Sequence, residues 1–482
     1  MSVHLTLATA PLSLEARYGK LAAAGSTEPS FGLVCLGTVA REAGAEVRLI
    51  EASAYGLTVA EAAASILEQA PDILGISCTT AGAVAAGELA AAVKSQRPEC
   101  MTIIGGCHAT AIPEETLREF TAFDMAVIGE GEDTLREIVE VFAETRAVPN
   151  SIAGTAVRCD SGIQFNPVRP LITDLNALPL PDWSLLPGFP QAYTPSPLRI
   201  KHWPCASIVL TRGCPNKCTF CDRSVFGNRC RAYSPEYAVQ LVKDLRYNYG
   251  VRELLIEDDT FVLSRKRVIQ FCDHMITDNV DVSWSCLGRA DLVTPEVLAT
   301  MKAAGCWHIS FGIESGDPDM LKSVHKNMDL EQVRQALEWS RQAGLRTKGF
   351  FMIGFPGETK ATIEATRRCA LRLPLTEISV MLMTPFPGSE LYETAGDYGT
   401  FEHDWRRMTA VDPVFVPHGF SRDDLEKERD AIVRAFYLRP RTVIDQFVHS
   451  LKTPTRMRAM VTAAFELIRQ TAGTLFAGRR KP

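Results

Sequence analysis

Apolar and polar positions follow two alternating periods along the first 145 residues. Short, nearly continuous apolar runs predict strands, and the longer segments between them carry apolar residues at helical spacing. Buried strands separated by amphipathic helices are typical of a parallel sheet that helices cover on both faces. The pattern therefore predicts a doubly wound, Rossmann-like sheet, with strands at residues 3–10, 46–52, 72–78, 101–106 and 124–131.

The same alternation returns after residue 206. Six apolar runs are again separated by helical patterns, and they lie at residues 207–211, 253–259, 283–290, 308–315, 347–358 and 377–388. Six strands are too few for a complete eight-stranded barrel. We therefore expect an open, partial (β/α)6 barrel, with its chemistry on the loops at the carboxyl ends of the strands.

Two further segments complete the predicted organisation of this α/β chain. Residues 146–205 contain the proline-rich stretch LPLPDWSLLPGFPQAYTPSPL, which suits neither a helix nor a central strand, although VRCDSGIQFNP before it could form a small hairpin. Residues after 395 are mostly helical in pattern. We expect a first domain at 1–145, an ordered connector at 146–205, the barrel at 206–394 and a helical C-terminal region at 395–482.

Composition indicates which cellular compartment and which kinds of partner suit the protein. The residues are 46% hydrophobic and 22% charged, which is ordinary for a soluble globular protein, and the net charge of -6 argues against general nucleic-acid binding. Fourteen cysteines, with neither a signal peptide nor an apolar run long enough to span a bilayer, favour reduced thiols in the cytoplasm. The helical pattern near residues 455–478 predicts a core-facing helix. Its flanking arginines leave peripheral contact with the inner membrane face as the alternative.

Three cysteines lie within the sequence TRGCPNKCTFCDRS, directly after the first barrel strand. Cys214, Cys218 and Cys221 form the pattern C-x3-C-x2-C. A structural zinc site usually takes four ligands, and zinc stays an alternative because Cys230 is nearby. A disulfide would leave one thiol over. A [4Fe–4S] cluster held by three thiolates keeps one iron open to an outside ligand, which is where metal chemistry can occur.

This motif resembles that of the radical S-adenosylmethionine (SAM) superfamily over residues 206–390. The family pattern is C-x3-C-x-aromatic-C, and Phe220 fills the aromatic position. Strand ends elsewhere in the barrel agree with the family, including GIES at residues 312–315. The resemblance implies that the open iron is chelated by SAM, and that SAM contacts Phe220, Asp258, Asp259, Arg289, Glu314, Ser315 and Gly354.

The order of the loops in the first domain resembles that of the cobalamin-binding domain. The resemblance implies cobalamin contacts at the carboxyl ends of the strands, at Ser77, Thr79, Gly105, Gly106, Gly129, Glu130 and Gly131. Many members of the family carry Asp-x-His-x-x-Gly after the first strand, and that His ligates cobalt. Here the same stretch reads PLSLEARYG. We therefore expect cobalamin without a protein nitrogen ligand, with His108 as the alternative ligand.

Both domains together resemble the cobalamin-dependent radical SAM enzymes, which include hopanoid methylases and anaerobic tetrapyrrole cyclases. The resemblance implies a C-methyltransferase that acts on an unactivated carbon through a 5′-deoxyadenosyl radical and methylcobalamin. An oxidative cyclase or rearrangement enzyme is the alternative, and a non-catalytic sensor is a minor one. The implied cofactors are a [4Fe–4S] cluster, SAM and cobalamin. The implied partners are a small-molecule or lipid substrate and an electron donor such as flavodoxin or ferredoxin. No residue is identified as a proton donor.

Overall fold

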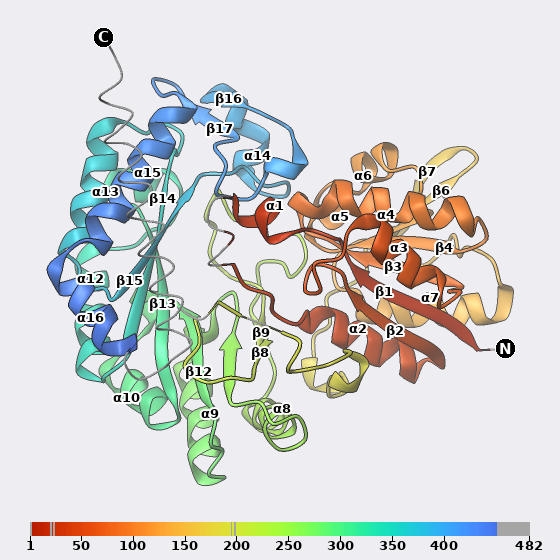
Figure 1. Cartoon of the computed structure of the whole chain (residues 1–482), viewed down its shortest axis with the longest axis horizontal. Coiled ribbons are helices and arrows are strands. Elements are labelled where there is room, and N and C mark those ends of the chain that lie inside the picture. The colour runs from red at the N-terminus through yellow and green to blue at the C-terminus, as the bar shows by residue number, and fades with distance from the viewer. Residues whose placement is uncertain (1, 20–21, 23–24, 194, 197–198, 451–482) are drawn as a thin grey trace.

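The computed structural model describes residues 2–19, 22, 25–193, 195–196 and 199–450. They form two large sheets, each covered by helices. The two sheets lie side by side in Figure 1, the first in red to yellow and the second in green to blue. A continuous apolar core runs from the first sheet through the connector into the barrel, with Trp183 of the connector among its fully buried side chains. The two domains therefore pack on each other as one unit.

The first sheet has the strand order β2-β1-β3-β4-β5-β6-β7, and its first five strands are parallel. Helices α2 and α7 pack together on one face, and α3 and α4 pack on the other. This doubly wound arrangement confirms the predicted fold class. The elements are β1 (Val3–Thr9), α1 (Leu14–Tyr18), α2 (Phe31–Glu42), β2 (Ala45–Glu51), α3 (Val59–Leu67), β3 (Ile73–Ser77), α4 (Ala83–Gln96), β4 (Met101–Gly105), α5 (Cys107–Ala111), α6 (Pro113–Glu119), β5 (Met125–Val127) and α7 (Glu132–Thr145).

The hairpin after α7 belongs to the first sheet. Strand β6 (Thr155–Cys159) pairs antiparallel with β5, and β7 (Gly162–Phe165) pairs antiparallel with β6. The first sheet therefore continues to residue 165, beyond the point where the connector is expected to begin. The pairing covers the edge of the short strand β5, which would otherwise leave unpaired backbone groups at the edge of the sheet.

The second sheet has six parallel strands in the order β15-β14-β13-β12-β11-β8. This order confirms the predicted open (β/α)6 barrel. Its carboxyl strand ends face the first domain. The elements are β8 (Cys205–Ile208), α8 (Pro235–Tyr247), β11 (Glu253–Ile256), α9 (Arg265–Thr277), β12 (Ser283–Gly288), α10 (Pro295–Ala303), β13 (Cys306–Glu314), α11 (Pro318–Ser323), α12 (Leu330–Gln342), β14 (Arg346–Ile353), α13 (Lys360–Arg372) and β15 (Glu377–Leu382).

The first barrel strand ends earlier than the apolar run predicts. The backbone N–H of Leu210 donates a hydrogen bond of 2.5 Å to the buried carboxylate of Asp258 instead of continuing the ladder. The chain then forms a small separate sheet of two antiparallel strands, β9 (Thr211–Arg212) and β10 (Arg231–Ala232). The cysteine loop lies between these two short strands, so both of its ends are fixed.

The C-terminal region is helical as expected except for one hairpin. It contains α14 (Glu390–Thr394), the antiparallel strands β16 (Gly399–Phe401) and β17 (Phe415–Pro417), α15 (Arg422–Tyr437) and α16 (Pro440–Ser450). Phe415 is fully buried between the hairpin and the barrel, which the helical pattern misses. The helix expected near residues 455–478 lies outside the described residues. Within the described part of the chain, no helix is both long and apolar enough to cross a membrane.

Candidate active site

A cavity of about 580 Å³ lies where the carboxyl ends of both sheets meet. Its first wall comes from the loops after β3, β4 and β5, at Ser77, Gly105, Gly106, Gly129, Glu130 and Gly131. Its opposite wall comes from the barrel, at Cys214, Cys218, Cys221, Asp259, Arg289 and Lys326. Two sets of residues that are more than 80 positions apart in the sequence therefore face the same space.

The cysteine loop is anchored at several points along its length. The backbone N–H of Gly213 donates to the carboxylate of Asp259 at 3.0 Å, and the N–H of Thr219 donates to the carbonyl of Val324 at 3.1 Å. The sulfur of Cys214 accepts hydrogen bonds of 3.2 Å from the side chains of Asn216 and Thr260. These two hydrogen bonds hold the sulfur of Cys214 in place at the cavity wall.

The three thiols do not form a ready-made site for a single metal ion. Among the described residues, no three His, Cys, Asp or Glu side chains converge closely enough to hold one metal ion, which disfavours the zinc alternative. A cubane cluster sets a different requirement, because each thiolate binds a different iron. Cys230, the fourth candidate ligand, is not part of the cavity wall.

The pKa values of two neighbouring thiols in the cysteine loop are shifted in opposite directions. The pKa of Cys218 is lowered to about 6, chiefly by a hydrogen bond from Cys221, and the nearby cations Lys326 and Arg289 lower it further against the effect of burial. The pKa of Cys221 is raised because its hydrogen bond is made to the Cys218 sulfur, and burial raises it further. One thiol of the pair is therefore ready to bind iron without first losing a proton at neutral pH.

The residues predicted to contact SAM fall into two groups. Asp259 and Arg289 line the cavity, and the Arg289 guanidinium is fixed by two hydrogen bonds of 2.9–3.0 Å to Asp291. The others are not part of its wall, and they lie at Phe220, Asp258, Glu314, Ser315 and Gly354. Asp258 is buried, which raises the pKa of its carboxyl group to about 6, and its oxygen accepts from the backbone of Leu210. The SAM contacts of both groups stay predictions.

The residues predicted to contact cobalamin line the first wall of the cavity, except for Thr79. Gly106 has a φ of +99°, and a Cβ atom there would lie 2.4 Å from the carbonyl oxygen of Cys78. Only glycine fits such a position, and it lets the backbone approach a large ligand. Behind these loops lies an apolar floor that the sequence does not single out, formed by Leu7, Leu33, Leu36, Ile76, Ile103 and Leu135.

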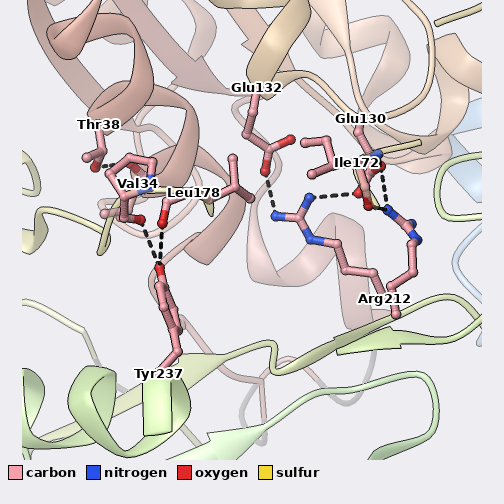
Figure 2. A network of polar contacts seen from close by, with 10 residues as sticks. Val34, Thr38, Glu130, Glu132, Ile172, Leu178, Arg212 and Tyr237 are labelled. Atoms are coloured by element: carbon pink, nitrogen blue, oxygen red, sulfur yellow. Dashed lines mark hydrogen bonds and ion pairs between the residues drawn. The ribbon is translucent and has the colours of Figure 1, made fainter. Parts of the chain in front are cut away.

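Glu130 has a second role in the structure. Its carboxylate accepts hydrogen bonds from Arg212 at 2.8 Å, from Arg231 at 2.7 Å and from the backbone N–H of Ile172 at 2.8 Å (Figure 2). Glu132 accepts from Arg212 at 2.5 Å. This network, which the pattern of the sequence does not reveal, ties the fifth strand loop of the first domain to strands β9 and β10. It therefore fixes the cysteine loop relative to the first domain.

His108, the alternative cobalt ligand, does not face the cavity. It is 1% exposed in α5, its ring lies 5.0 Å from that of Trp405, and burial lowers its pKa to about 4. Neither ring nitrogen has a hydrogen-bond partner within the part of the chain that the structure describes. His108 is absent from the cavity wall, although its neighbour Cys107 is part of it. His108 is therefore not placed as a ligand for a cofactor in this cavity, and cobalamin without a protein nitrogen ligand stays a prediction.

Comparison with known proteins assigns both halves of the chain. Residues 20–139 match the model of the B12 binding domain, and residues 208–370 match that of the radical SAM superfamily. An uncharacterized methyltransferase of Pyrococcus horikoshii is 33% identical over 428 residues, which cover 88% of this chain and 91% of that protein. The chain belongs to the radical SAM enzymes with a B12-binding domain. Its cofactors are a [4Fe–4S] cluster, SAM and cobalamin.

Two more distant matches agree with this assignment. The anaerobic magnesium-protoporphyrin IX monomethyl ester cyclase of Rubrivivax gelatinosus is 27% identical over 420 residues, covering 86% of this chain and 74% of that protein. The solved structure of the radical SAM methyltransferase TsrM from Kitasatospora setae, with cobalamin and a [4Fe–4S] cluster bound, has a TM-score of 0.66 at 18% identity. It covers 82% of this radical SAM chain and 78% of that one. The predicted fold and the resemblance to the tetrapyrrole cyclases are confirmed.

Proposed function

We propose that this radical SAM enzyme transfers a methyl group to an unactivated carbon of a small molecule. The observation that carries the proposal is the shared cavity, because the wall of the B12-binding domain and the cluster cysteines face the same space. The relative that matches along nearly its whole length is a methyltransferase. When bound, the cluster with SAM supplies radical chemistry at carbon, and cobalamin supplies methyl transfer.

The residues of this chain then have defined tasks. The thiolates of Cys214, Cys218 and Cys221 bind three irons, and they leave the fourth iron open. Asp259 and Arg289 lie at the cavity wall next to the cysteine loop, where a carboxylate and a guanidinium can orient the amino and carboxylate groups of SAM. The glycines on the opposite wall admit cobalamin close to the backbone. The apolar floor lowers the polarity of the cavity, which limits side reactions of reactive intermediates.

A second candidate function is oxidative cyclisation. The cyclase of Rubrivivax gelatinosus matches 86% of this chain, so the same two domains also occur in an enzyme with that name. No residue of the described cavity favours one outcome over the other, since the same fold supports several reactions. We favour methylation because the relative with the higher identity is the methyltransferase. In both cases the enzyme needs a one-electron donor, for which flavodoxin or ferredoxin is the proposed class.

The test is anaerobic turnover with methyl-deuterated SAM and extracts of the source cell, followed by mass spectrometry. We expect a product that carries the labelled methyl group. We also expect S-adenosylhomocysteine and 5′-deoxyadenosine in equal amounts, because one SAM supplies the methyl group and a second supplies the radical. A cyclised or dehydrogenated product without label, together with 5′-deoxyadenosine only, would contradict methyl transfer and support the second candidate.

The cobalamin of this enzyme should show no nitrogen ligand from the protein. We expect the electron paramagnetic resonance spectrum of bound Co(II) cobalamin to lack splitting by an axial nitrogen, because His108 is buried against Trp405 and outside the cavity wall. The His108→Ala variant should give the same spectrum as the wild-type enzyme. A nitrogen triplet in the wild type that disappears in the variant would show that His108 reaches the cobalt.

A further inference from the structure

A buried ion pair lies next to the cluster loop. The ammonium of Lys326 lies 2.9 Å from a carboxylate oxygen of Glu314, and both side chains are about nine-tenths buried, at 9% and 10% exposure. Lys326 lines the cavity together with Cys218 and Arg289, whereas Glu314 lies behind it. The cationic member of the pair therefore faces the space next to the predicted cluster.

The backbone around this pair is built to hold it. A Cβ atom at Gly312 would lie 2.5 Å from the carboxylate of Glu314 and 2.9 Å from the ammonium of Lys326, so the pair occupies the space that glycine leaves. Three residues without glycine's freedom adopt positive φ angles here, namely Glu314 at +67°, His325 at +54° and Asn327 at +44°. Such conformations cost free energy and persist only where the surrounding structure enforces them.

The segment that carries Lys326 is bonded directly to the cysteine loop. The backbone N–H of Thr219 donates to the carbonyl of Val324 at 3.1 Å, and the sulfur of Cys218 lies 3.8 Å from the carbonyl oxygen of His325. Lys326 is the next residue in the chain. Burial opposes its charge, but the nearby carboxylate of Glu314 raises the pKa of Lys326 above its usual value, so it stays an ammonium ion. The bond between Thr219 and Val324 fixes the segment of Lys326 beside Cys218.

We propose that Lys326 raises the reduction potential of the [4Fe–4S] cluster, and that Glu314 partly offsets this effect. The proposal rests on the cluster of the proposed function. Reduction adds one electron from a donor to the iron–sulfur core, and no bond to the protein forms or breaks. A fixed cation stabilises the added negative charge, and a fixed anion destabilises it, with little screening in a buried site. Charge near the cluster is one of the factors that set such potentials.

The two members of the pair should shift the potential in opposite directions. We would titrate reconstituted protein without SAM with dithionite at controlled potentials, and follow the reduced cluster by electron paramagnetic resonance. In Lys326→Met we expect at least a tenfold smaller ratio of reduced to oxidised cluster at a given potential, which is about 59 mV for one electron. In Glu314→Gln we expect a larger ratio than in the wild type. Lys326→Arg should restore the wild-type value, because it retains the charge.

Lys322→Met is the matched control, because this lysine lies in the neighbouring helix α11 but is 74% exposed. It should leave the potential unchanged. Iron content distinguishes a failure of the proposed function from a failure of the proposed role of Lys326. A wild-type protein that binds no cluster would overturn the proposed function, whereas a full cluster whose potential moves in the same direction in both pair variants, or in neither, would overturn only the role of Lys326. If Lys326→Met loses its cluster, the nearly isosteric Glu314→Gln decides the matter by the sign of its shift.

Discussion

Alanine in place of Cys214, Cys218 or Cys221 is expected to remove the iron–sulfur absorbance and to stop the cleavage of SAM. Each substitution leaves two thiolates for a cluster that needs three, and no further thiol lines the cavity wall near this loop except Cys107 on the opposite domain. The loss should be complete rather than partial, since SAM binds to the cluster itself. The measurements are iron and sulfide content, the visible absorbance, and the yield of 5′-deoxyadenosine after anaerobic reduction.

Cys230→Ala is the control for this prediction. Cys230 lies near the end of the same loop, but it is outside the cavity wall that the other three cysteines line. The variant should retain the cluster and its SAM cleavage at wild-type levels. If Cys230 proved as necessary as the other three cysteines, the fourth iron would have no open position, and the mechanism through iron-bound SAM would be wrong.

The architecture follows from the sequence because the alternation of buried strands and amphipathic helices is a local signal. Six strands of the barrel and five of the first sheet each produce an apolar run that can be read without knowing the partner strand. Strands β6 and β7 give a weaker signal, because most of β7 is exposed. The early end of β8 cannot be predicted either. It depends on the Asp258 carboxylate, which comes from a different strand and intercepts the Leu210 N–H.

The residues of the candidate site also divide into those that a local sequence motif predicts and those that depend on contacts in the fold. Cys214, Cys218 and Cys221 are close in the sequence and form a recognisable motif, so their spacing alone is enough to predict them. Lys326 gives no such signal, because its importance depends on a contact with Glu314 and on its place beside the cysteine loop. For Glu130, the sequence predicts the position but not the contacts. The sequence places it correctly at a strand end facing the cavity, but its binding partners are arginines about 80 to 100 residues away.

Arg212→Met is expected to destabilise the contact between the two domains. The side chains of Arg212 and Glu132 are 5% and 7% exposed, and Arg212 is the only ion-pair partner of Glu132 among the residues that the structure describes. Breaking such a pair leaves a buried carboxylate without a countercharge, which costs on the order of 3–5 kcal/mol. We expect a clearly lower urea midpoint and weaker retention of cobalamin, because Glu130 and Gly131 of the cavity wall precede Glu132 directly.

The double variant Arg212→Met with Glu132→Gln separates charge from packing. It removes the unpaired carboxylate and replaces both side chains by neutral ones of similar size. Glu130 keeps its bond of 2.7 Å to Arg231. Replacing a buried ion pair by neutral groups of similar volume is often close to neutral in stability. The urea midpoint of the double variant should therefore recover most of the loss. A double variant that is as unstable as Arg212→Met alone would show that the arginine stabilises the seam through its packing, with the charge of Glu132 playing no part.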